Sequence, residues 1–166
     1  MRAAVLCLVS ASVAIATTGQ GAAPHDSWKT YTNVRFGYQV CYPPHLLKPQ
    51  GEADNGDGQV FRSRDGAELR VFGSNNALEL SLAQEAKAQA RAAMGPNGRI
   101  NYIRTGIHWN VTSGQDRIAH VFYHKTFQRA DQFVSFQIKY PRTQAARYEP
   151  VIERISRCFV LLKPAF

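Results

Sequence analysis

The sequence predicts an α+β domain in which helices pack on an antiparallel sheet. The order of its segments, strands then a helix then strands then a helix, is typical of this class. Asp65-Gly66 stands between two runs that contain apolar residues, which is a strong signal for a β-hairpin. Between residues 99 and 140, successive runs rich in aromatic and β-branched residues are separated by turns. These runs indicate three or four adjacent antiparallel strands.

The first predicted elements are extended segments over 29–34 and 37–42. Side chains alternate along a strand, so one face of the second segment carries Tyr38, Val40 and Tyr42. Pro43-Pro44 ends this segment, because proline donates no ladder hydrogen bond. Residues 51–58 (GEADNGDG) are expected to form a loop.

The predicted hairpin has strands over 59–63 and 67–72, on either side of Arg64-Asp65-Gly66. In its second strand the apolar residues do not keep strictly to one face, since Leu69 and Val71 alternate with Arg70 and Phe72. Such a pattern fits a sheet that is covered on both sides at that point.

The clearest helix is predicted over 78–94, which is rich in Ala, Gln, Glu and Lys. Ser81 and Gln84 would make a capping box if the helix begins there. Gly95-Pro96 ends the helix. The expected buried stripe consists of Leu82, Ala86, Ala90 and Ala93.

The second half of the chain is expected to contain strands over 99–105, 108–112, 117–127 and 132–140, with a turn over 113–116. A closing helix is predicted over about 148–158, with Pro150 in its first turn, where proline is tolerated. Apolar residues at helical spacing support this helix: Val151, Ile152, Ile155 and Phe159.

The N-terminus resembles a secretory signal peptide. Arg2 gives a short positive region, and residues 3–16 form an uncharged apolar stretch that is too short to span a membrane. Ala14-Ile15-Ala16 is a candidate cleavage site. We expect a signal peptide over 1–16, with cleavage as late as about residue 23, then a flexible lead over 17–27 and a single domain over 28–166. The alternative is a core strand or helix at the N-terminus.

If the chain is exported, its cysteines indicate a disulfide. Removal of the signal peptide takes Cys7 away and leaves Cys41 and Cys158, which are 117 positions apart (158 − 41). The oxidising compartment outside the cytosol permits a disulfide between them. In the chain-entropy model, closing so long a loop destabilises the unfolded state by about 4.7 kcal/mol. Two free buried thiols are the alternative.

The formal net charge of +8 would suit an anionic surface, an acidic polymer or an acidic partner. The cations are scattered and no run of five occurs, which argues against a nucleic-acid-binding arm. No stretch after the N-terminus reaches the length of a membrane helix.

Candidate chemical sites are weak. His120 and His124 lie on one face of a predicted strand, and His108 is expected nearby, but four residues of strand separate two Cα atoms by roughly 13 Å. We interpret these as half-exposed sheet histidines. Residues 54–58 (DNGDG) lack the alternating ligands of an EF-hand and are expected to form a turn. No motif for a catalytic nucleophile or a phosphate-binding loop occurs, so no catalytic, cofactor-binding or metal-binding residue is predicted.

Three motifs together resemble the PsbP-like superfamily. They are the opening 31–43 (YTNVRFGYQVCYP), the hairpin 60–71 (VFRSRDGAELRV) and the close 148–159 (YEPVIERISRCF), where Cys158 replaces a serine frequent in relatives. The resemblance covers most of 28–159 and implies an α/β/α sandwich with a central antiparallel sheet. It implies little about function. Bacterial relatives include small exported proteins, some with accessory or immunity-type binding roles.

The sequence therefore predicts a periplasmic or secreted binding or accessory protein without enzymatic activity, with an acidic protein as its partner. An immunity-type inhibitor of a toxin is one concrete version of this function. The first alternative is a small hydrolase that acts on an envelope polymer. The second is a protein that binds an anionic ligand on the sheet face that carries aromatic residues and arginines. The only residues predicted to have a defined role are Cys41 and Cys158.

Overall fold

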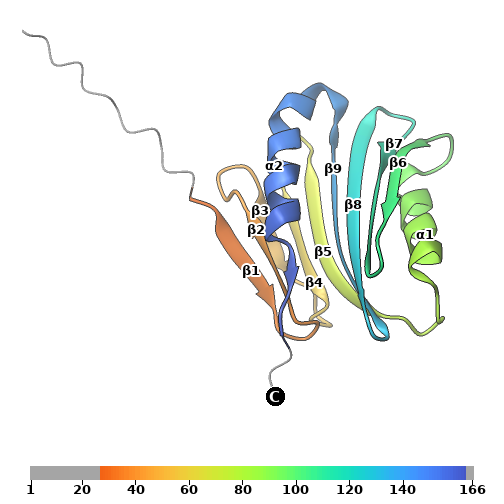
Figure 1. Ribbon diagram of the computed structural model, residues 1–166. Helices are drawn as coiled ribbons and strands as arrows, with labels where there is room; N and C mark the ends of the chain where they lie inside the picture. The colour runs from red at the N-terminus through yellow and green to blue at the C-terminus, as the bar shows by residue number, and fades with distance from the viewer. Residues whose placement is uncertain (1–26, 164–166) are drawn as a thin grey trace, which may run out of the picture.

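Seven antiparallel strands form the central sheet in a computed structural model that describes residues 27–163 (Figure 1). The predicted signal peptide over 1–16 lies outside these residues. The outermost strands of the sheet are β3 and β6, and neither pairs with a further strand within residues 27–163. In spatial order the strands are β3 (Lys48–Glu52), β4 (Gly58–Arg62), β5 (Glu68–Asn75), β9 (Gln132–Pro141), β8 (His120–Arg129), β7 (Trp109–Gln115) and β6 (Arg99–Thr105).

One face of this sheet is covered by a smaller sheet and by a helix. The smaller sheet contains β1 (Lys29–Asn33), β2 (Tyr38–Tyr42) and β10 (Val160–Leu161), with β2 in the middle. Helix α2 (Ala145–Cys158) follows a 3₁₀ turn (Arg142–Gln144) and contacts β2, β8 and β9. The side chains of β2 alternate between buried and half-buried, as its sequence predicts. The main core lies here and includes Tyr38, Phe61, Phe136, Tyr148 and Phe159.

The opposite face carries helix α1 (Leu82–Met94), which contacts β6, β7 and β8 (Figure 1). Its N-cap is Ser81, which forms the predicted capping box with Gln84, and all four residues of the predicted stripe are buried. A second, smaller core forms where Ala90 and Ala93 pack on Phe122. Helices therefore lie on both faces of a central antiparallel sheet, which confirms the predicted α+β architecture.

The disulfide joins Cys41 in β2 to Cys158 at the end of α2, with 5.8 Å between the two Cα atoms. It links the smaller sheet to the closing helix, the two elements that together cover one face of the central sheet. Among the described residues, no helix is long and apolar enough to cross a membrane.

Several predicted boundaries are wrong. Strand β3 occupies a segment that the sequence leaves partly as a loop, because all five of its residues are exposed and no apolar alternation marks it. Strand β7 continues to Gln115 through the predicted turn, and the turn lies over 116–119. Strand β10 has only two residues and was not predicted. Helix α2 begins at Ala145, so Pro150 stands inside the helix and not in its first turn.

Candidate binding groove between α2 and strands β6 to β8

A groove runs beside α2 on the face that this helix covers only in part. Helix α2 contacts β8 and β9, and the outer strands β6 and β7 extend beyond it. One part of the groove has a volume of about 410 Å³ and the adjoining part about 570 Å³, and both are lined by Tyr123 and Ser156. The first part is also lined by Tyr102, Arg104, Trp109 and Lys125. We call these six residues the groove residues.

The strand register brings the groove residues together. In the antiparallel ladder Tyr102 lies opposite Ser113, which lies opposite Tyr123. One step of two residues along, Arg104 lies opposite Val111, which lies opposite Lys125. Directly opposed residues point to the same face, so the side chains of β6 and β8 converge on the side where α2 lies.

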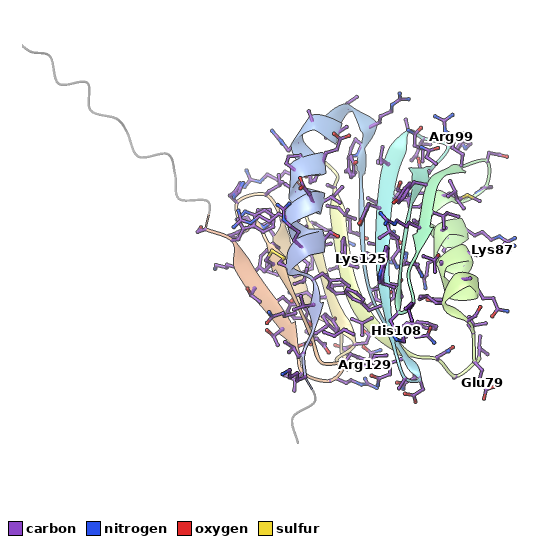
Figure 2. All side chains as sticks on the ribbon, viewed as in Figure 1. Glu79, Lys87, Arg99, His108, Lys125 and Arg129 are labelled. Atoms are coloured by element: carbon purple, nitrogen blue, oxygen red, sulfur yellow. A yellow bond between two sulfur atoms is a disulfide. The ribbon has the colours of Figure 1, made fainter. Side chains whose placement is uncertain are left out.

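Lys125 connects the strands to the end of α2. Its Nζ donates hydrogen bonds to the backbone oxygen of Ser156 at 2.8 Å and to the Ser156 hydroxyl at 3.2 Å. Figure 2 labels Lys125 on β8, on the side toward α2. Burial lowers the pKa of the Lys125 amine. The negative end of the helix dipole and the terminal carbonyl groups favour a cation here, so this lysine caps α2.

Aromatic rings supply the rest of the groove wall. The Tyr123 ring stacks on Phe136 with centroids 5.7 Å apart, and the hydroxyl lies 3.3 Å from that of Ser156. Burial raises the pKa of the Tyr123 phenol. The Arg104 guanidinium lies 5.8 Å from the centre of the Trp109 ring, within the range of a cation–π contact. Stacked rings with cations beside them form a surface suited to anionic or polar extended ligands.

Gly106 makes room for the Trp109 ring. A Cβ at position 106 would lie only 2.3 Å from the indole Nε1 and 2.5 Å from Cε2. Any side chain at this position would therefore push the indole out of its place beside Arg104. The glycine after β6 thus determines where the aromatic wall of the groove stands.

The contact between Ser156 and Lys125 has the residue types of a serine–lysine dyad, but its setting is that of a helix cap. Ser156 lies in the last turn of α2, where backbone carbonyls point outward. An oxyanion needs N–H donors, which are found at the opposite end of a helix. The Lys125 amine also donates a hydrogen bond to the Ser156 carbonyl, and this bond stabilises the end of α2. The arrangement therefore favours binding over nucleophilic catalysis.

The charges on the strands of the groove are one-sided. Strands β6, β7, β8 and β9 contain no aspartate or glutamate. Their cations are Arg99, Arg104, Lys125, Arg129 and Lys139. The carboxylates that line the adjoining part of the groove, Glu149 and Glu153, come from α2, and Glu153 pairs with Arg157. Lys139 lies on the opposite face, where it pairs with Asp116 at 2.7 Å. The open part over β6 and β7 therefore takes its positive charge from Arg99 and Arg104, with Lys125 beside them.

A second hollow, of about 420 Å³, lies on the opposite face over β4 and β5. Its floor includes Val60 and the half-buried Phe72, so no element of the described chain supplies the expected cover over β5 at this place. Arg62 and Arg70 both pair with Glu68, at 3.0 Å and 2.8 Å. Because one carboxylate serves both cations, this hollow offers less free charge to a ligand than the groove beside α2.

The histidines considered above do not come together as a site. His124 is 1% exposed, which corrects the expectation of a half-exposed histidine for this residue, whereas the His120 side chain is 27% exposed, as expected. His120 lies at the start of β8, with its Nδ1 3.3 Å from Asp116, and His108 lies in the turn before β7. In the 54–58 turn, the Asn55 side chain contacts Asp57. Among residues 27–163, no group of three His, Cys, Asp or Glu side chains is arranged to hold a metal ion.

Sequence reasoning did not single out the groove residues. Arg104 and Lys125 were visible only as two of many scattered cations, because their 21-residue separation (125 − 104) hides that β7 brings them to one face. The one available signal was the interleaving of aromatic residues with cations along the predicted strands. Ser156 carries no signal at all, since its role depends on where α2 ends.

Comparison with known proteins supports the fold. No protein-family model matches the chain, and no curated protein matches it in sequence. The solution structure of cyanobacterial PsbP (CyanoP) from Synechocystis sp. PCC 6803 matches with a TM-score of 0.60 and 14% sequence identity, over 85% of this chain and 96% of that one. A likeness at this identity establishes the fold and leaves function open. The chain therefore has the PsbP-like fold that its three sequence motifs predict.

Proposed function

We propose that the chain is an exported accessory protein that binds an acidic protein partner through the groove between α2 and strands β6 to β8. The observation that carries this proposal is the positive charge of the strand side of the groove, in the part over β6 to β8. Arg104 and Lys125 converge beside aromatic rings, on strands that contain no carboxylate. Electrostatic complementarity of this kind guides association and selects partners by charge. An immunity-type inhibitor of a toxin is one concrete form of this function.

Export rests on separate support. The N-terminal segment has the composition of a signal peptide, and the disulfide is compatible with an oxidising compartment. A periplasmic or secreted protein of this size with an open charged groove suits an accessory role.

The test is affinity capture of the partner from a native envelope extract at low salt, followed by purification and a direct affinity measurement with the pure pair. Tyr102→Ala/Arg104→Ala should weaken the complex by about tenfold or more, because both side chains lie on the open groove. Lys87→Ala is the matched control for loss of a cation, since Lys87 is exposed on α1 (Figure 2). Equal affinities for the two variants would place the partner elsewhere and contradict the proposal.

A second function, hydrolysis of an envelope polymer, is favoured by one contact, that of Lys125 with the Ser156 hydroxyl. The purified protein should be assayed with activated esters and with isolated peptidoglycan. We expect no turnover above background. Turnover that Ser156→Ala abolishes would replace the binding function with a serine hydrolase, because that variant leaves the backbone carbonyl that accepts from Lys125 in place.

A further inference from the structure

Strand β6 presents a free main-chain edge beside the groove. The Gly106 N–H donates to the Trp109 carbonyl at 2.7 Å, which fixes the hydrogen-bonding phase of the β6–β7 ladder. Because hydrogen-bonded and non-hydrogen-bonded pairs alternate in an antiparallel ladder, the pairs Thr105–Asn110 and Ile103–Thr112 are of the second kind. The N–H and C=O groups of Ile103 and Thr105 therefore point away from β7, to the open edge.

The two sheet edges differ in how they are protected. Strand β3 carries Pro49 and a positive-φ residue, Gly51, and a register shift interrupts its ladder. Proline and irregular backbone are devices that block strand addition. Strand β6 has a shift only near its start, between Ile100 and Tyr102, and the stretch from Tyr102 to Thr105 pairs regularly with β7. That regular stretch can accept another strand.

The side chains of β6 give this edge two different faces. Tyr102 and Arg104 line the groove. Arg99 points to the same face, because it lies opposite Gln115 in the ladder and donates a hydrogen bond to the Gln115 side chain. Ile103 lies on the other face, is 57% exposed and has Thr112 as its cross-strand neighbour. An added strand would therefore meet guanidinium groups on one face and the aliphatic side chain of Ile103 on the other.

Charge selects the occupant of this edge. Two copies of β6 paired with each other would bring two pairs of arginines, Arg99 and Arg104 from each copy, onto one face of the joint sheet without a carboxylate. Like charges on facing strands are destabilising. A strand with carboxylates on the groove face would instead neutralise both arginines, and the Lys125 amine lies on that same face.

We propose that an extended acidic segment of the partner adds to β6 as a further strand of the central sheet. This inference rests on the proposed function and names the recognition mode. Main-chain hydrogen bonds to Ile103 and Thr105 provide affinity, and alternating side chains provide specificity. The segment alternates acidic residues, which face Arg104 and the groove, with apolar residues, which pack on Ile103.

The test uses a synthetic peptide with the length of β6, seven residues, in which glutamate alternates with valine. A peptide of the same composition with its glutamates and valines in separate blocks is the control for charge alone. Backbone amide resonances of the protein should shift in β6 on addition of the alternating peptide, and the amides of Ile103 and Thr105 should gain protection from hydrogen exchange. The block peptide should bind at least about tenfold more weakly.

Methylated peptides test the main-chain hydrogen bonds without any change to the protein. Two versions of the alternating peptide carry N-methyl groups on either the odd or the even amides. Alternate amides of a strand point to the same side, so only the odd or only the even amides of the peptide can donate to β6. Only one of the two versions should therefore lose binding. Equal loss or equal retention in both versions would overturn strand addition.

Protein variants test the named residues. Arg104→Glu should weaken peptide binding by about tenfold or more, while Lys87→Glu, with the same net charge, should leave it unchanged. Ile103→Pro removes an edge N–H that no ladder bond within residues 27–163 uses, and Ile103→Ala keeps that N–H while it removes most of the aliphatic side chain. Binding should fall further for the proline variant, with circular dichroism confirming that both variants are folded.

The outcomes separate this inference from the proposed function. If the captured partner binds and responds to Tyr102→Ala/Arg104→Ala, but neither the peptide nor the partner protects the β6 amides, the groove is the site and strand addition is wrong. If β6 becomes protected in the protein alone as its concentration rises, the edge pairs with a second copy and the acidic occupant is wrong. If the peptide protects β6 but no acidic partner is found, the recognition mode stands and the proposed function fails.

Discussion

At the scale of single residues, the burial of His124 predicts that acid destabilises the fold. The imidazole is 1% exposed, its Nε2 lies 3.2 Å from the Thr126 hydroxyl, and its Nδ1 has no hydrogen-bond partner among the described residues. Burial lowers the pKa of this histidine from 6.5 to about 4. A group with a depressed pKa in the folded state contributes stability that is complete above the unfolded pKa and is lost as pH falls toward the folded one.

We therefore expect the free energy of unfolding to fall by roughly 3 kcal/mol between pH 6.5 and pH 4 through His124 alone. Urea unfolding at pH 7, 5.5 and 4.5 measures this loss. His124→Gln should be less stable at pH 7 but should lose much less stability on acidification. His108→Gln, at an exposed position, is the control and should follow the wild-type profile. A wild-type profile in His124→Gln would show that another group carries the acid sensitivity.

At the scale of elements, Pro150 tests where α2 begins. In a helix that starts at Ala145, a residue at position 150 would donate its N–H to the carbonyl of Ala146, and proline cannot make that bond. A proline inside a helix costs about 3 kcal/mol relative to alanine, whereas one in the first turn costs little. The position of the helix start therefore determines the effect of a substitution at Pro150.

We expect Pro150→Ala to raise the free energy of unfolding by about 1 to 3 kcal/mol. Chemical denaturation at pH 7 measures the change. Glu149→Ala, at the exposed neighbouring position, alters the side chain without altering the backbone and is the control. A neutral effect of Pro150→Ala would mean that the helix effectively starts near Tyr148, as the sequence alone predicts.

The elements that could be predicted from sequence are those in which one face is buried. Burial selects apolar residues at a fixed period. The sequence therefore predicts the buried stripe of α1 and the alternation of Tyr38, Val40 and Tyr42 in β2. Strand β3 forms only because the exposed edge of β4 pairs with it, so its own residues carry no pattern. The groove depends on register and on the end of α2, and a local sequence window reports neither.

At the scale of the whole molecule, the disulfide links the two ends of the folded domain. It joins the second strand of the described chain to the end of the last helix, across 117 positions. Replacing both cysteines in Cys41→Ser/Cys158→Ser should lower the free energy of unfolding by about 2 to 5 kcal/mol, since the unfolded chain regains the freedom that the bond removes. Urea unfolding of this variant against the oxidised wild type measures the loss. The reduced wild type should match the variant, and a stability equal to that of the oxidised protein would contradict the prediction.

The number of free thiols tests both the disulfide and the removal of the signal peptide. Of the three cysteines, only Cys7 lies in the predicted signal peptide. Unreduced, denatured 166-residue chain should therefore titrate one thiol, and the processed protein recovered from the envelope should titrate none. After reduction the counts should rise to three and two, because each disulfide releases two thiols. Two thiols in the unreduced processed protein would rule out the Cys41–Cys158 bond, whereas a single thiol would show that Cys7 is retained and that the predicted signal peptide is not removed.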